Sequence, residues 1–201
     1  VAVPIGDQVA DALIERLEPK VRALRIGPGT DREAEMGPLV TKAHLDKVRG
    51  YIDQGEREGA KLVVDGRDFK MQGYENGFFI GGSLFDRVTK DMTIWREEIF
   101  GPVAPIVTFS SEEEAIEMAN DTEYGLASYV FTKDQARMYR VAESIEFGLM
   151  GYNVGVISNP AAPFGGVKQS GLGREGGAEG IEEYTSVQYV GIADPWAATK
   201  A

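Results

Sequence analysis

A carboxylate and an aromatic ring stand together in a tight turn near the middle of the sequence. Glu98 and Phe100 lie in the run Glu-Glu-Ile-Phe-Gly-Pro at residues 97–102, just before an apolar segment. The glycine allows backbone angles that other residues avoid and the proline fixes φ, so the pair predicts a defined turn. The carboxylate could accept hydrogen bonds from two neighbouring hydroxyls, such as a ribose diol, with Phe100 as an apolar wall. Spacing alone names no ligand, and a solvated glutamate pair before a buried phenylalanine is the competing interpretation.

The composition excludes several classes of function. The 201 residues carry a formal net charge of -11, which argues against nucleic-acid binding because phosphates need clustered Lys and Arg. There is no cysteine and one histidine, His44, so this chain holds no disulfide or thiol nucleophile and we expect no metal site. We find neither an apolar run of membrane-spanning length nor a signal segment, and therefore expect a cytoplasmic protein. Because the sequence starts on Val1 rather than Met, we interpret it as a piece of a longer protein.

The elements that must position the turn can be predicted from hydrophobic periodicity. Residues 1–5 form a candidate strand, and the apolar positions after it indicate a helix that Pro19 should kink or break. Thr41 is the expected N-cap of a second helix. His44 and Lys47 lie three apart near its start and so share a face. Without further information, His44 is interpreted as a solvated side chain.

The second half of the sequence alternates strands and helices. We predict strands at residues 126–131 and 149–153, with helices capped by Ser111 and Thr132 before and between them. Short connections between such elements imply parallel strands joined by crossover helices. The predicted fold class is therefore α/β, with a parallel sheet and crossover helices.

A glycine-rich segment follows. Gly171, Gly173 and Gly176 formally match the dinucleotide-binding pattern, but a Lys-Gln-Ser run precedes them where a strand is required, so we reject that interpretation. The glycines indicate either an irregular loop whose backbone approaches a ligand or another chain, or a flexible surface loop. A final strand is predicted from Tyr184 to Ile192, and a strand at a chain end often pairs with another subunit.

Two motifs together resemble the aldehyde dehydrogenase superfamily: residues 97–102 and, further on, the run at residues 163–175 that contains the glycines. Their order, separation and content match, and the resemblance extends to about Ile192. Members of this family oxidise an aldehyde with NAD or NADP. A cysteine thiolate attacks the carbonyl, a hydride passes to the nicotinamide, and water or coenzyme A releases the thioester. The resemblance implies a small-molecule aldehyde as substrate and NAD or NADP as cofactor.

The resemblance also implies a domain organisation. Residues 1–183 would belong to the C-terminal half of the catalytic domain, residues 184–192 would be the strand of a homo-oligomer, and residues 193–201 would be a tail. The nucleophilic cysteine, the general base and the N-terminal cofactor-binding part would lie outside this chain. We therefore expect these residues alone to be catalytically inactive, because the reaction needs its nucleophile.

Roles for individual residues follow from the resemblance alone. Glu98 would accept hydrogen bonds from the nicotinamide ribose, and Phe100 would pack beside it. Phe164 would stand at the mouth of the substrate tunnel, and Glu175 would relay protons or support the site. Near the same ribose the resemblance also places His44 and Lys47.

Two parts of the chain resemble different branches of the family. Residues 1–100, above all 62–77, resemble methylmalonate-semialdehyde dehydrogenases, which are coenzyme A acylating. Residues 148–192 resemble succinate-semialdehyde dehydrogenases, in which Ser158 would hydrogen-bond the far carboxylate of the substrate. Because the later segment would line the substrate mouth, we favour the succinate-semialdehyde type, with the methylmalonate type as alternative. A non-catalytic association module and a freestanding nucleotide-binding domain are two further hypotheses.

Overall fold

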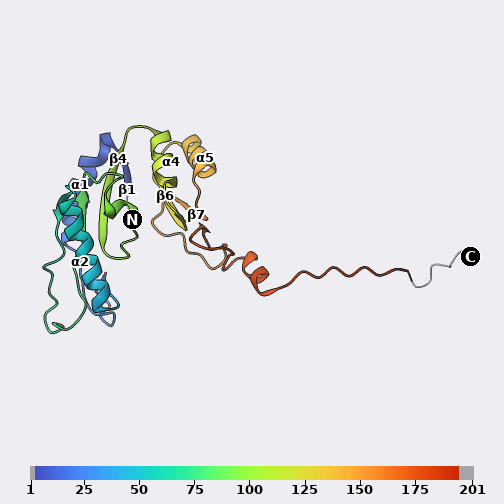
Figure 1. The fold of residues 1–201 in the computed structure, drawn as a ribbon, viewed down its shortest axis with the longest axis horizontal. Helices are drawn as coiled ribbons and strands as arrows, with labels where there is room; N and C mark the ends of the chain where they lie inside the picture. Colours follow the sequence, from blue (N-terminus) through green and yellow to red (C-terminus); the bar gives the residue numbers. More distant parts are fainter. Residues whose placement is uncertain (1–2, 195–201) are drawn as a thin grey trace, which may run out of the picture. The chain divides into compact units, whose positions relative to one another are not determined.

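The structure is a computed structural model that describes residues 3–194. The chain divides into two compact units, the first ending at Asp121 and the second beginning at Thr122 (Figure 1). The predicted catalytic-domain range 1–183 stays a prediction, because the compact units of one chain do not fix where the domains of a longer protein end.

The first unit is built on a four-stranded sheet with the order β1-β4-β3-β2. Strand β4 runs parallel to both of its neighbours, and β2 is antiparallel to β3. A parallel pair needs a crossover connection, and helices of this unit supply it. The strands are β1 (Val3–Gly6), β2 (Lys61–Val64), β3 (Ser83–Asp86) and β4 (Val103–Phe109), and the helices are α1 (Asp7–Arg22), α2 (Lys42–Arg57), α3 (Thr93–Arg96) and α4 (Glu112–Asn120).

Helices cover both faces of this sheet. Successive side chains of a strand point to opposite faces, and the fully buried neighbours Leu84 and Phe85 of β3 belong to different clusters. Leu84 packs with Ala10 of α1, whereas Phe85 packs with Val48 of α2 and Ile94 of α3. This three-layer arrangement confirms the α/β class that the sequence predicts.

The second unit repeats the parallel pairing on a smaller scale. Strands β6 (Ala127–Val130) and β7 (Leu149–Tyr152) are parallel and are connected through α5 (Gln135–Ser144). A two-residue strand β5 (Tyr124–Gly125) pairs antiparallel with β8 (Val167–Lys168), and the 3-10 helix η1 (Glu179–Tyr184) follows the glycine-rich segment. The predicted crossover helix between two parallel strands is therefore confirmed.

Two local predictions are wrong. The predicted break at Pro19 is wrong, because helix α1 continues to Arg22, and Pro19 lies in its exposed last turn, where it removes one helix hydrogen bond. The cap of α5 is Asp134 and not Thr132, since the Asp134 carboxylate accepts from the Ala136 and Arg137 amides.

The cap predicted at Thr41 is confirmed by a 3.1 Å hydrogen bond from the His44 amide.

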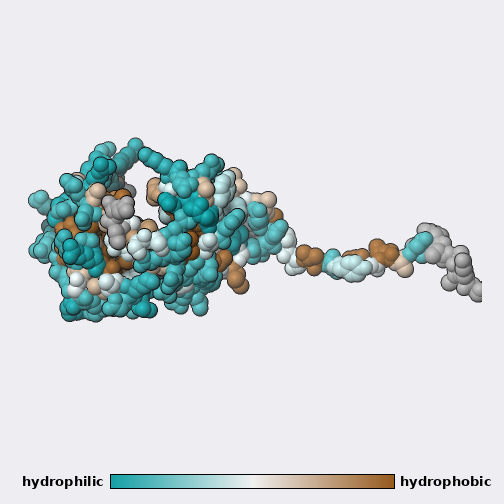
Figure 2. Space-filling model, turned by 90° about the horizontal axis from the view of Figure 1, so that it is seen from above, coloured by the Kyte–Doolittle hydropathy of each residue, from teal (hydrophilic) through white to brown (hydrophobic). Residues whose placement is uncertain are grey.

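The strand predicted from Tyr184 to Ile192 does not form within the chain by itself. Tyr184 closes η1, and in the described part of the chain residues 185–194 form no strand. A strand that needs an external partner cannot be assigned in one chain, so the oligomerisation role stays a prediction. Figure 2 shows hydrophobic residues, coloured brown, exposed along this segment. Val187 and Tyr189 are among the exposed large hydrophobic residues of the chain.

Between residues 3 and 194, no helix has the length and apolar character that a membrane span requires.

Candidate functional site

One face of α2 contacts the turn at residues 97–101. His44, Val48 and Tyr51 share that face, because residues three and four apart are neighbours on a helix. The His44 Nε2 donates to the Phe100 carbonyl oxygen at 2.7 Å. The Tyr51 hydroxyl donates to a Glu97 carboxylate oxygen at 2.5 Å. The interpretation of His44 as a merely solvated side chain is therefore wrong, because it is half-buried and bonded to the turn.

The turn holds Phe100 in a conformation that costs energy. Its φ is +54°, in the left-handed region that residues with a Cβ rarely adopt. Its ring is 77% exposed, so the interpretation of a buried core phenylalanine is wrong. The ring meets the His44 imidazole edge-on, with 6.4 Å between centroids. Gly101 is required next to it, since a Cβ there would lie 2.7 Å from Val48 Cγ2.

Glu98 presents an available carboxylate on the same turn. It is exposed, and within residues 3–194 its side chain makes no hydrogen bond or ion pair. Lys47 is exposed, and its Nζ lies 5.3 Å from the centroid of the Tyr51 ring. The turn therefore offers an acceptor for hydroxyl groups and, two residues on, an apolar surface.

The hydrogen bond to Glu97 raises the pKa of Tyr51 to about 12, with burial as a further cause. Because this pKa lies above the ordinary value of about 10, the stabilisation that the contact gives is complete below pH 10. It is lost as the pH rises from about 10 to about 12. We expect Glu97→Gln to move the titration of Tyr51 back toward the ordinary value.

This expectation can be checked by NMR titration of ring-labelled tyrosine, with Tyr51→Phe to assign the signal. An identical midpoint in the wild type and in Glu97→Gln would contradict the contact.

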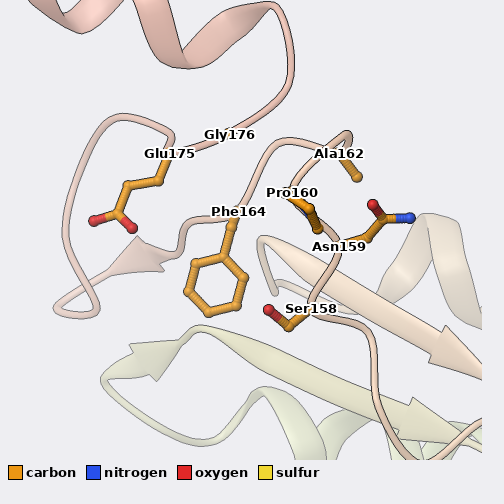
Figure 3. Close-up of a pocket in the computed structure, with 7 residues that line it drawn as sticks. All are labelled: Ser158, Asn159, Pro160, Ala162, Phe164, Glu175 and Gly176. Carbon is orange, nitrogen blue, oxygen red and sulfur yellow. The ribbon is translucent and has the colours of Figure 1, made fainter.

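The second unit contains a pocket of about 360 Å³. Three residues that the sequence singled out, Ser158, Phe164 and Glu175, line it together (Figure 3). The remaining lining residues are Asn159, Pro160, Ala162 and Gly176.

The pocket wall is a short antiparallel backbone pair. The Phe164 amide donates to the Glu175 carbonyl at 2.6 Å, and the Glu175 amide donates to the Phe164 carbonyl at 2.7 Å. The half-buried Arg174 braces it, because its Nη1 donates to the Gly166 and Gly173 carbonyls at 2.9 and 2.6 Å. The glycine-rich segment is thus a braced loop that forms one wall of a pocket. Strand β8 is followed by a turn and not by a long helix, in agreement with rejecting the dinucleotide-binding pattern.

The side chains of the pocket point in different directions. In Figure 3 the Ser158 hydroxyl points toward the Phe164 ring, whereas the Glu175 carboxylate points away from both. Asn159 accepts a hydrogen bond from the Ala161 amide at 3.0 Å, which fixes the turn before Phe164. None of the described residues that line this pocket is a Lys or an Arg. It therefore offers a hydroxyl and an aromatic wall, with no positive charge from its own lining.

The predicted site residues fall into two groups. His44, Lys47, Glu98 and Phe100 belong to the first unit, where α2 and the turn bring them together. Ser158, Phe164 and Glu175 belong to the pocket of the second unit. Sequence analysis did not identify Tyr51, Glu97, Asn159 and Arg174. Glu97 and Arg174 lie within the two motifs at residues 97–102 and 163–175, and Asn159 carries the Asn-Pro pair that marks a turn, whereas Tyr51 has no local signal.

The chain is similar to known proteins over nearly its whole length. A family model described as "Aldehyde dehydrogenase family" matches residues 3–190. A malonate-semialdehyde dehydrogenase of Pseudomonas aeruginosa is 52% identical over 189 residues, which are 92% of this chain and 38% of that protein. A succinate-semialdehyde dehydrogenase of Paenarthrobacter nicotinovorans is 46% identical over 192 residues, which are 96% of this chain and 42% of that protein.

The chain is also similar to solved structures of aldehyde dehydrogenases. A betaine aldehyde dehydrogenase of Staphylococcus aureus in complex with NAD+ matches with a TM-score of 0.86 and 37% identity, over 91% of this chain and 36% of that one. The chain belongs to the aldehyde dehydrogenase family. It spans about two fifths of the length of these relatives.

Proposed function

We propose that this chain is the C-terminal portion of an NAD(P)-dependent aldehyde dehydrogenase that oxidises a carboxylated semialdehyde through a cysteine thioester. The observation that carries the proposal is the pocket in which Ser158, Phe164 and Glu175 meet. The names of two relatives, a malonate-semialdehyde and a succinate-semialdehyde dehydrogenase, support a substrate with a second carboxyl group. The cysteine, the general base and most of the cofactor site would come from the preceding part of the protein.

The pocket supports recognition of the substrate by hydrogen bonding and shape. The Ser158 hydroxyl would donate to the carboxylate of the semialdehyde, and the Phe164 ring would cover its methylene groups. Because the described lining residues include no Lys or Arg, a charge partner for that carboxylate would come from elsewhere in the protein. The Glu175 carboxylate points away from Ser158 (Figure 3), so we assign Glu175 a supporting role through its backbone pair with Phe164.

The turn of the first unit fits the ribose of a nicotinamide cofactor. A ribose diol needs hydrogen-bond acceptors and tolerates an apolar neighbour, and Glu98 and Phe100 present both in exposed form. Lys47 would add a positive charge nearby. When bound, the cofactor supplies the hydride acceptor, and the residues of this chain would orient its ribose. Whether the cofactor is NAD or NADP is decided by residues outside the turn.

The proposal is tested with the longer protein that contains this chain. We expect reduction of NAD or NADP with malonate or succinate semialdehyde, and a lower kcat/KM with betaine aldehyde, whose charge is opposite. Equal kcat/KM for all three aldehydes would contradict the proposed substrate class, and no reduction with any of them would contradict the activity.

Ser158→Ala is expected to raise the KM for succinate semialdehyde about tenfold while sparing butanal. The reason is that a site built to hydrogen-bond a substrate group discriminates through that bond, which for a charged acceptor amounts to about 1.5–3 kcal/mol. Steady-state kinetics on both aldehydes measures the effect. Gly155→Ala is the control, because a Cβ there meets no atom within 4 Å. Losses of the same size on both aldehydes would rule out the role of Ser158.

A coenzyme A acylating enzyme of the methylmalonate-semialdehyde type is the alternative, and products formed with and without coenzyme A separate the two.

A non-catalytic association module is a second candidate. The exposed apolar side chains of Val187, Tyr189 and Ile192 favour it, and a homo-oligomer formed through residues 184–192 would fit both proposals. Sedimentation of a variant truncated after residue 183 tests this, and an unchanged oligomer would contradict it.

A further inference from the structure

The contacts between α2 and the turn flank Glu98 on both sides. Tyr51 bonds the residue before it, since its hydroxyl donates to the Glu97 carboxylate. His44 bonds the second residue after it, since its Nε2 donates to the Phe100 carbonyl. Neither contact involves the side chains of Glu98 or Phe100, which remain exposed.

We propose that Tyr51 is a positioning residue for the cofactor ribose, acting through Glu97, and that His44 acts with it on the turn rather than on the ribose. This inference rests on the proposed function. It differs from the roles that the resemblance implies in two ways. His44 would contact the turn and not the cofactor, and Tyr51 receives a role that the proposed function does not include.

The turn needs such support because of its own conformation. Phe100 has a positive φ and an exposed ring, so neither backbone preference nor burial stabilises it where it stands. A strained backbone persists only when surrounding contacts determine it. The bond from His44 to the Phe100 carbonyl is such a contact, and the packing of Gly101 on Val48 is a second.

Tyr51 is suited to position Glu97 because it is itself fixed. Only 8% of its surface is exposed, and it belongs to the core cluster with Val48 and Ile52. A buried tyrosine has two rotatable bonds, both held by packing, so the direction of its hydroxyl is defined. Lys47 Nζ lies over its ring at 5.3 Å and occupies the solvent side. The Tyr51 hydroxyl is therefore a donor of fixed position, and it bonds the carboxylate of Glu97, the residue next to Glu98.

The test is Tyr51→Phe in the longer protein, since phenylalanine keeps the packing and removes only the hydroxyl. We expect hydride transfer in a single turnover to slow about tenfold, the effect of losing one hydrogen bond to a charged group. The NAD dissociation constant, measured by calorimetry, should rise less. Tyr74→Phe is the matched control, because Tyr74 is exposed in a loop, its ring contacts the Phe79 ring, and its hydroxyl makes no hydrogen bond within the described residues.

A second readout needs no cofactor. Without NAD, we expect faster hydrogen exchange in Tyr51→Phe for the peptide that covers residues 97–103, and unchanged exchange for residues 61–64 of β2. His44→Ala should have the same effect, and His44→Gln, which keeps an amide donor, should restore protection. Unchanged exchange of residues 97–103 in both Tyr51→Phe and His44→Ala would overturn the inference.

Glu98→Gln separates this inference from the proposed function. If Tyr51 acts through the turn, Tyr51→Phe combined with Glu98→Gln should be no slower than Glu98→Gln alone. If Glu98→Gln slows hydride transfer and Tyr51→Phe does not, or if the two losses multiply, the positioning role is overturned and the proposed function stands. If Glu98→Gln leaves hydride transfer unchanged, the cofactor role of the turn fails, and the inference fails with it.

Discussion

Glu98→Gln is expected to lower the rate of hydride transfer in the longer protein by about 100-fold, because a small misplacement of a reacting group costs about that much. The amide keeps the size of the side chain but loses the negative charge and one of two acceptor oxygens. A ribose diol would then be held by one hydrogen bond instead of two. Since the Glu98 side chain has no partner within residues 3–194, the fold should not change.

The measurement is a single-turnover experiment with deuterated aldehyde. We expect a larger primary isotope effect on kcat in Glu98→Gln, because hydride transfer becomes slower than the other steps. Glu113→Gln is the matched control, since Glu113 is an exposed glutamate in the first turn of α4. A rate in Glu98→Gln that equals the rate in Glu113→Gln would show that Glu98 does not position the cofactor.

Elements with a regular period could be predicted from the sequence. The helix at α2 was predicted because its apolar positions recur at helical spacing and Thr41 precedes them. The parallel pair β6 and β7 followed from the helix between them. The strand β3 was not identified, since all four of its residues are buried. A strand buried on both faces has no alternation to reveal it.

Local exceptions were harder to predict because other contacts determine them. Pro19 did not end α1, since one proline near the exposed end of a helix costs less than the packing of α1 on the sheet contributes. Helix α5 begins two residues later than predicted, so Asp134 and not Thr132 is its N-cap. The sequence does not decide between the two, because several polar residue types can cap a helix.

In both groups of site residues, contacts between residues far apart in the sequence could not be predicted. The turn at residues 97–102 was found because Gly and Pro mark turns, yet its link to Tyr51 spans 46 residues and leaves no local pattern. The sequence left open whether Phe100 is an exposed apolar wall or a buried side chain, since aromatic residues are found in both environments. The pocket depends on the backbone pair between Phe164 and Glu175, and a hydrogen bond between main chains does not depend on side-chain type.

The close approach of three main-chain segments in the second unit predicts the largest loss of stability. A Cβ on Gly148 would lie 2.0 Å from the Gly165 carbonyl oxygen, and both atoms belong to backbones that cannot rotate away. Gly148 also donates its amide to the Gly125 carbonyl at 3.0 Å, so it cannot move without breaking that bond. Gly148 therefore fixes the distance between the start of β7 and the loop that follows Phe164.

We expect Gly148→Ala to destabilise the chain by about 3 kcal/mol, at the upper end of the usual cost of overpacking. Urea unfolding measures this, and Gly155→Ala serves as the control, because a Cβ at Gly155 meets no atom within 4 Å. The control should change stability by no more than about 0.5 kcal/mol. Equal stability of the two variants would mean that β7 and the loop are further apart than described. A loss confined to Gly148→Ala would show that the pocket wall carrying Phe164 is held in place by main-chain packing, which side-chain patterns in the sequence do not reveal.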